Sequence, residues 1–493
     1  MVIGRRASIV MKLGLRNIPR RPVRAGLIVF GLMLATTVIG SAFATGDIMT
    51  YTMRSLVTDN LGSVDEVVLI NPPEAERGEQ LRALSSGSFG GLPSENLYFF
   101  FERNLEDVQS VASDSETIAA TLPAILDRVT LVHTEQQQLQ GSVMLMAIPL
   151  EYPDEFGRLE SVAGSEDLSQ LEPDEVFINA AAADDFDIQP GDVLQIGTWE
   201  NRFALGGPWY ARVKAVVNSA GLTGSQPALI ADINRFQDII SREGLVNVVL
   251  VANEGGIDSV ENSEAAASEL RVALADHEAA RGLYEIMQKP VAQQAMTDIE
   301  RALDGAAREE YTQLRLEASK DEMTGRFISL ISEPRMRHGL FLLSRRIPGR
   351  EDRVATLGYL RDLAALWVLE VKRDGMQEAE QYGNVVTTVF LVLGIFSIGA
   401  SVLLIALIFN LLATDRSGEL ATMRAMGMRR IQIMGVFLFE GLAYNLAGAV
   451  LGALAGLASA YLTMVSLAGT LDDFGINLEP RIEPGSMLLA FSL

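Results

Sequence analysis

The sequence contains no cysteine and only three histidines in 493 residues. Without cysteine there is no disulfide framework, iron–sulfur cluster, thiolate zinc site or cysteine nucleophile. The histidines, His133, His277 and His338, are far apart in the sequence. The P-loop pattern GxxxxGK[ST], the metalloprotease pattern HExxH and the hydrolase pattern GxSxG are also missing. We therefore expect no catalytic residue, no metal site and no bound cofactor in this chain.

Basic residues are in deficit, with 40 Lys and Arg against 63 Asp and Glu, for a formal net charge of −23. Nucleic-acid-binding surfaces are basic, so this balance argues against a nucleic-acid partner. The hydrophobic content of 48% and the mean hydropathy of +0.21 exclude a disordered tail. Acidic and apolar residues are segregated along the chain, which indicates membrane segments beside a polar domain.

The first long uncharged run, Ala25–Thr45, is roughly 30 Å long as a helix, which matches the hydrocarbon core of a bilayer. Residues 1–24 contain seven basic residues and no acidic one. By the positive-inside rule they form a cytoplasmic, amphipathic N-terminus. A cleavable signal peptide is the alternative, since Ala42-Phe43-Ala44 resembles a cleavage site. The full spanning length favours transmembrane helix 1 at residues 25–45.

Further apolar runs follow near the end of the sequence. Residues 385–412 and 431–466 are long enough to predict transmembrane helices 2 and 3. Residues 467–485 are expected to form an external loop. Residues 486–493 begin a fourth apolar run that reaches only about 12 Å as a helix. We therefore expect a bundle of three complete spans and a truncated fourth.

Three glycines recur at intervals of four residues in the third predicted span: Gly448, Gly452 and Gly456. Small residues on one helix face let backbones approach closely in lipid, which predicts a helix-packing surface. The alternative is that glycine is simply common in membrane helices. Glu440 is the one charged residue of the span. One interpretation of Glu440 is an ion-binding or helix-pairing role. The alternative is that its side chain simply extends toward the membrane interface.

Residues 46–384 form the polar part, with 56 acidic and 28 basic side chains. Because one membrane pass precedes it, we expect a soluble extracytoplasmic domain. Its sequence predicts a mixed α/β fold, with strands and helices over these ranges: Val64–Ile70, Ser142–Ile148, Trp209–Val217 and Val246–Val251 for strands, Glu264–Leu274 and Val291–Ala307 for helices. Residues Ser85–Gly91 have the composition of a flexible loop. An acidic group at Asp184, Asp185, Asp187 and Asp192 fits a solvated turn better than a calcium site.

The segment 413–430 lies between predicted spans 2 and 3 and contains four arginines, which places it in the cytoplasm. Residues Glu419–Met426 are mostly good helix formers, and Gly427 suits a helix C-terminus. We expect a short helix against the membrane. An ordinary basic connecting loop is the alternative.

The order Arg416, Glu419-Leu420, Arg424-Ala425-Met426-Gly427, Arg430 and then Phe439-Glu440-Gly441 resembles the FtsX-like permease domain of MacB/LolC/LolE/FtsX-type ABC transporters. Asp415 stands where that family has a glutamate. The segments Glu175–Asn179 and Ile188–Val193 look like the MacB-like periplasmic core. The resemblance implies the N-terminal half of a longer, duplicated permease.

The resemblance also implies partners and a site. A cytoplasmic ABC ATPase subunit would dock on a coupling helix, and a second permease half, from a like chain or a missing C-terminal repeat, would complete the transporter. Carried over by position, the ATPase-coupling residues are Asp415, Arg416, Glu419, Leu420, Met423, Arg424, Gly427 and Arg430.

The favoured hypothesis is a multi-pass permease of the cell membrane, without ATPase activity of its own. It would couple ATP hydrolysis by its partner to movement of the extracytoplasmic domain, for export or extraction of a lipid, lipoprotein, peptide or drug-like substrate. One alternative is a non-transporting scaffold that activates an extracytoplasmic cell-wall hydrolase. Another is a membrane-anchored receptor with no ATPase.

Overall fold

The structure is a computed structural model, and it describes residues 22–71, 98–134, 138–164, 168–197, 209–219, 221–257, 259–303, 305–415, 418, 422, 424–427 and 430–472. The chain divides into two compact units. One unit comprises residues 1–54 and 379–493, and the other comprises residues 55–378. The predicted amphipathic segment 1–24 lies almost wholly outside the described residues, as do the predicted loop at Ser85–Gly91 and the predicted fourth span.

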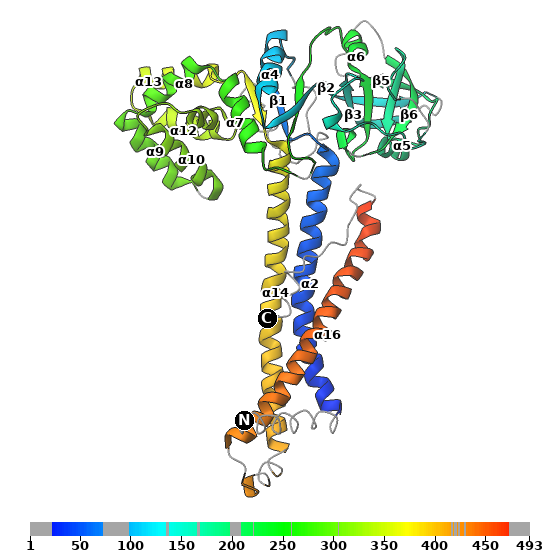
Figure 1. Ribbon diagram of the computed structural model, residues 1–493, viewed down its shortest axis with the longest axis vertical. Coiled ribbons are helices and arrows are strands. Elements are labelled where there is room, and N and C mark those ends of the chain that lie inside the picture. The colour runs from blue at the N-terminus through cyan, green and yellow to red at the C-terminus, as the bar shows by residue number, and fades with distance from the viewer. Residues whose placement is uncertain are drawn as a thin grey trace. The chain divides into compact units, whose positions relative to one another are not determined.

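The first unit is built from parts of three long helices, α2 (Pro22–Leu61), α14 (Val371–Asp415) and α16 (Arg430–Asp472) (Figure 1). Among the described residues, two segments are long and apolar enough to cross a membrane, Ala25–Leu61 and Gly441–Ser466. Each helix is longer than the span predicted for it. α16 in particular continues to Asp472, through the start of the predicted external loop.

α14 carries the second predicted span, and a series of its apolar side chains is exposed in this unit. The members with the largest exposure are Val385, Ile395, Phe396, Leu403 and Leu407. Exposed apolar side chains on a long helix suit a lipid environment. The number of membrane passes stays a prediction.

The second unit contains a nine-stranded sheet in the order β3-β7-β4-β6-β5-β2-β8-β1-β9. The strands are β1 (Glu66–Ile70), β2 (Ile118–His133), β3 (Gln138–Ile148), β4 (Glu175–Asn179), β5 (Val193–Gly197), β6 (Trp209–Val217), β7 (Ala228–Asp232), β8 (Val248–Asn253) and β9 (Leu366–Leu369). The pairs β3–β7 and β4–β6 are parallel and the others are antiparallel. β2 pairs with β8 along its first half and with β3 along its second, so this long strand joins the two halves of the sheet.

The strand predictions agree with this sheet. β6 has the predicted range, and its side chains alternate between buried and more exposed positions from Trp209 to Val217. Apolar side chains from both faces of the sheet form two core clusters. Helices α4 (Glu102–Asp114), α5 (Ala180–Phe186), α6 (Ile233–Ile240) and α7 (Ser263–Leu274) contribute residues to the first cluster.

The turn predicted for the acidic stretch after β4 is present from Asp187 to Asp192, whereas Asp184 and Asp185 lie in α5. Asp187 has a φ of 50° and ends α5, and the amide of Asp192 donates to the carbonyl of Gln189 at 3.1 Å. The Asp192 carboxylate accepts the Gln189 amide at 2.8 Å and lies 3.2 Å from Nε2 of His133. In the part of the chain that the structure describes, no group of three or more His, Asp or Glu side chains is arranged to hold a metal ion.

A cluster of six short helices between α7 and β9 was not anticipated. They are α8 (His277–Met287), α9 (Pro290–Ala302), α10 (Gly305–Ala318), α11 (Gly325–Ser332), α12 (Met336–Arg346) and α13 (Arg350–Asp362). The single helical stretch expected over 291–307 is divided between α9 and α10, where Gly305 has a φ of 61°. The helices enclose a core of their own around Tyr311 and Phe327, to one side of the sheet (Figure 1).

Candidate functional site

The segment between α14 and α16 contains the residues expected to contact an ATPase. Of these, Arg416, Glu419, Leu420 and Met423 lie outside the described residues. Asp415 is the last residue of α14, and Arg430 is the first of α16. These two predicted site residues therefore mark the two ends of the connection.

The described part of this segment ends in a helical turn. Thr422, Arg424 and Ala425 are helical, and the amide of Met426 donates to the carbonyl of Thr422 at 3.0 Å. Gly427 donates to the carbonyl of Arg424 at 3.0 Å and has a φ of 89°. Positive φ is accessible to glycine at little cost, so Gly427 ends the turn as its sequence position suggested. The exposed Arg424 leaves a cation available at the surface of the turn.

In the first unit, the three regularly spaced glycines of α16 face α2. A Cβ atom placed on Gly448 would lie 2.5 Å from Cβ of Leu32, and one on Gly452 would lie 2.5 Å from Cβ of Thr36. At Gly456 a Cβ would lie 2.9 Å from the backbone amide nitrogen of Ser41. No real Cβ is accommodated at such distances, so the absence of side chains lets the two backbones meet.

We call Gly448, Gly452 and Gly456 the glycine seam. A polar contact also connects α2 and α16 at this seam. The hydroxyl of Thr37 donates to the carbonyl of Met33 at 2.7 Å and lies 3.3 Å from the carbonyl of Gly452. Such a bond between helices has few competitors in an apolar environment. On the other side of α16, apolar residues such as Leu442, Leu446 and Leu454 are exposed. One face of α16 therefore packs on α2, and the opposite face suits lipid.

In the second unit, a buried ion pair lies where the chain leaves α2 and where it enters α14. Nζ of Lys372 lies 2.7 Å from Oδ1 of Asp65, with side-chain exposures of 0% and 3%. The amide of Lys372 donates to the carbonyl of Asp65 at 3.2 Å, and Oδ2 of Asp65 accepts the amide of Asn253 at 2.8 Å. The first turn of α14 is thus held directly to the residues that follow α2.

Adjacent charges extend this ion pair toward the helical cluster. Glu370, at the end of β9, accepts from Arg271 of α7 at 3.0 Å and from Arg373 of α14 at 2.7 Å. Asp374 of α14 lies 2.7 Å from the guanidinium of Arg335, the residue before α12. We call Asp65, Glu370, Lys372, Arg373 and Asp374, with their partners Arg271 and Arg335, the ionic hub. It fixes the start of α14 to the sheet and to the helical cluster.

Burial changes the pKa of several carboxyl groups near the hub. Desolvation raises the pKa of Glu66 well above its ordinary value, and Asp65 adds to the rise. Burial, opposed by Arg335, raises the pKa of Asp374 to about 6. Burial and the neighbouring carboxylate of Glu333 raise the pKa of Glu310 to about 7. The surroundings of the hub therefore include carboxyl groups that gain protons near neutral pH.

Sequence reasoning did not identify the hub. The signal in the sequence was the occurrence of charged residues at the ends of apolar strands: Asp65 before β1, Glu66 as its first residue, and Glu370 after β9. Charged residues at strand ends are usually solvated, so this pattern does not separate a buried pair from a surface one.

Comparison with known proteins gives a family for the last part of the chain. Residues 391–493 match the profile of a family described as FtsX-like permease C-terminal. These residues are therefore similar to the C-terminal part of FtsX-like permeases, the family that the sequence resembles. No curated protein matches the sequence.

Solved structures similar to this chain include an extracellular domain and a periplasmic region. The extracellular domain of the noncanonic ABC-type transporter YknZ from Gram-positive bacteria is 14% identical, with a TM-score of 0.26 over 42% of this chain and 89% of that one. The periplasmic region of MacB from Actinobacillus actinomycetemcomitans is 14% identical, with a TM-score of 0.27 over 44% of this chain and 87% of that one.

Proposed function

We propose that this chain is the permease subunit of an ABC transporter and that it couples ATP hydrolysis by a separate cytoplasmic ATPase to movement of its extracytoplasmic domain. The match of residues 391–493 to FtsX-like permeases carries this proposal. The exposed turn that ends at Gly427, between two long helices, supports it as a place for the ATPase to dock.

The proposed topology has three spans, at residues 25–45, 385–412 and 431–466, with residues 1–24 and 413–430 in the cytoplasm. Residues 46–384 would lie outside the cytoplasm. The seven basic residues before the first span and the arginines of segment 413–430 support this orientation. The glycine seam supports close packing of spans 1 and 3, because it removes side chains where the helix backbones meet.

The proposed mechanism is mechanical. α14 is one continuous helix of 45 residues, roughly 65–70 Å long. Its last residue, Asp415, adjoins the proposed docking segment, and its first turn carries Lys372 and Asp374 of the ionic hub. A displacement at the docking end would thus be passed along a stiff element to residues that are ion-paired to the sheet and to the helical cluster. Movement of the domain then needs no catalytic group in this chain.

The proposed partners are the ATPase and a second permease half, either a like chain or a C-terminal repeat. The proposed substrate is a lipid, lipoprotein, peptide or drug-like molecule that is exported or extracted. Because FtsX-like permeases normally perform no chemistry themselves, we expect ATPase activity to reside in the partner.

The docking proposal is tested with the full chain and the P-loop protein that co-purifies with it from its host membrane. Arg424→Glu reverses an exposed charge, and like-charge contact at an interface costs several kcal/mol, so we expect roughly tenfold or greater loss of ATPase association. Glu419→Ala is expected to weaken coupling in the same direction. Arg301→Glu, an exposed charge reversal on α9, is the matched control and should leave association unchanged. Normal docking and normal coupled ATPase activity in both test variants would refute the assignment.

The orientation is tested separately, because the natural sequence has no cysteine. A single cysteine introduced by Arg424→Cys should resist an impermeant thiol reagent added to intact cells and react after the membrane is opened. Labelling from the outside would mean that the docking segment is not cytoplasmic.

A further inference from the structure

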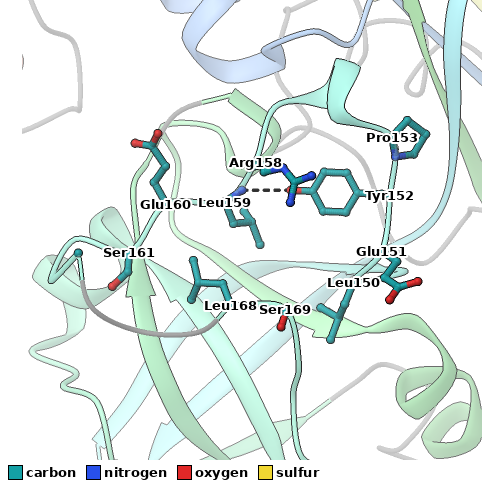
Figure 2. Close-up of a pocket in the computed structure, with 11 residues that line it drawn as sticks. Leu150, Glu151, Tyr152, Pro153, Arg158, Leu159, Glu160, Ser161, Leu168 and Ser169 are labelled. Atoms are coloured by element: carbon teal, nitrogen blue, oxygen red, sulfur yellow. Dashed lines mark hydrogen bonds between the residues drawn. The ribbon is translucent and has the colours of Figure 1, made fainter.

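A pocket lies in the long connection between β3 and β4. It is an open hollow of about 940 Å³, within the roughly 300–1,000 Å³ that is usual for small-molecule sites. Its walls come from residues 150–153, residues 158–161, Gly164, Leu168 and Ser169. Figure 2 shows Leu168 between Ser161 and Leu150, with Leu159 above it, around the hollow.

Besides Pro153, the apolar or aromatic side chains of the lining are those of Leu150, Tyr152, Leu159 and Leu168, and these four contact the core. Each is half-buried, because one side packs against the second core cluster of the sheet. The hydroxyl of Tyr152 accepts the amide of Leu159 at 3.1 Å and so ties two walls together (Figure 2). The apolar lining is therefore anchored to the core, and it leaves apolar surface toward the pocket.

Acidic side chains outnumber basic ones in this lining, with Glu151 and Glu160 against Arg158. Glu151 and Glu160 line the pocket, and the guanidinium of Arg158 is paired with Asp154 at 2.6 Å. A cleft lined by one sign of charge concentrates ions of the opposite sign. An anionic ligand would meet repulsion here, and a fully polar cation would gain nothing from the leucines.

We propose that this pocket binds amphipathic organic cations, with the apolar body against Leu150, Leu159 and Leu168 and the positive charge toward Glu151 and Glu160. This deepens the proposed function by naming a substrate class. The role of the site in transport rests on the proposed function, whereas binding of a cation to the pocket does not depend on that function. The pocket would then collect the substrate outside the membrane before or after its passage.

The test uses the full chain in phosphatidylcholine nanodiscs, with empty nanodiscs subtracted. The probe is rhodamine 6G, an apolar cation, and the comparison is the ethyl ester of fluorescein, which shares the ring system and is anionic. Fluorescence anisotropy should show saturable binding of rhodamine 6G that weakens with salt, and at least tenfold weaker binding of the anion. Equal binding of the two dyes, or no saturable binding above empty nanodiscs, would overturn the proposal.

Variants locate the binding to this pocket. Glu151→Gln with Glu160→Gln should raise the Kd for rhodamine 6G about three- to tenfold, and Leu168→Asn should raise it about fivefold through lost apolar contact. The matched control, Glu102→Gln with Glu243→Gln, removes two exposed carboxylates elsewhere and should leave the Kd unchanged. An unchanged Kd in both pocket variants would refute the site.

ATPase association of the same pocket variants separates this proposal from the proposed function. Wild-type association with altered dye binding supports both. Failure of the chain to bind any ATPase would count against the transporter assignment alone, and failure of the dye test would count against the pocket alone.

Discussion

Replacing Lys372 by methionine tests the central ion pair of the hub. Methionine keeps most of the side-chain volume but removes the cation that lies 2.7 Å from Asp65. Asp65 then stays buried, with the 2.8 Å hydrogen bond from the Asn253 amide as compensation. Breaking a buried pair by removing one partner costs about 3–5 kcal/mol. In a domain of this size, each kcal/mol corresponds to about 2 °C, so we expect the Tm to fall by about 6–10 °C.

The Tm is measured on the full chain in nanodiscs by intrinsic fluorescence, for which the buried Trp367 of β9 is a suitable reporter. Adding Asp65→Asn to Lys372→Met removes the unpaired charge and retains an oxygen that accepts the Asn253 amide. This double variant should recover most of the lost stability, since a buried pair replaced by neutral groups is often close to neutral. Lys320→Met is the surface control, because its pair with Glu317 is half exposed and worth less than about 1 kcal/mol.

The pH dependence of Lys372→Met provides a further check. Burial raises the pKa of Asp65, and Lys372 is the main opposing influence, so loss of the lysine raises this pKa further. A raised carboxyl pKa destabilises the fold above the folded pKa, and the penalty disappears below the unfolded value. The Tm deficit should therefore shrink as the pH falls from 8 toward 5. A deficit no larger than that of Lys320→Met, or a double variant no more stable than Lys372→Met, would refute the reasoning.

Two further predictions concern other contacts. Gly452→Val should separate α16 from α2, because a Cβ there meets Thr36 and a backbone carbonyl, whereas Gly26→Val has open space and is the control. Disulfide formation between cysteines introduced by Ala44→Cys and Ala460→Cys should drop severalfold in the first variant only; unchanged cross-linking would contradict the seam. Glu310→Gln should raise the Tm at pH 8 and have a much smaller effect near pH 5, because the penalty of a carboxyl with a pKa raised from 4.5 to about 7 is complete above the raised value and is lost as the pH falls toward the ordinary one. A benefit that is the same at both pH values would show that the raised pKa is not its cause.

Patterns that are local in the sequence were sufficient for much of the molecule. The uncharged run from Ala25, the alternation of β6 from Trp209 and the glycine at position 427 each predicted a feature that the structure contains. A helix, a strand and a turn are set mainly by neighbouring residues, so their signals are readable without the rest of the chain. The number of membrane passes and the roles of Arg424 and its neighbours stay predictions.

The tertiary structure alone decided which of these elements meet. Four-residue spacing marked Gly448, Gly452 and Gly456 as one face of a helix, but only the fold showed that α2 lies against it. The pairing of Asp65 with Lys372 joins residues that are 307 positions apart, and charged residues at strand ends are usually solvated. The order of the nine strands and the lining of the pocket likewise depend on contacts between residues that are far apart in the sequence. Whether a side chain is buried or ion-paired depends on the residues that surround it in the folded protein. The sequence pattern gives the identity of the residue but not those surroundings.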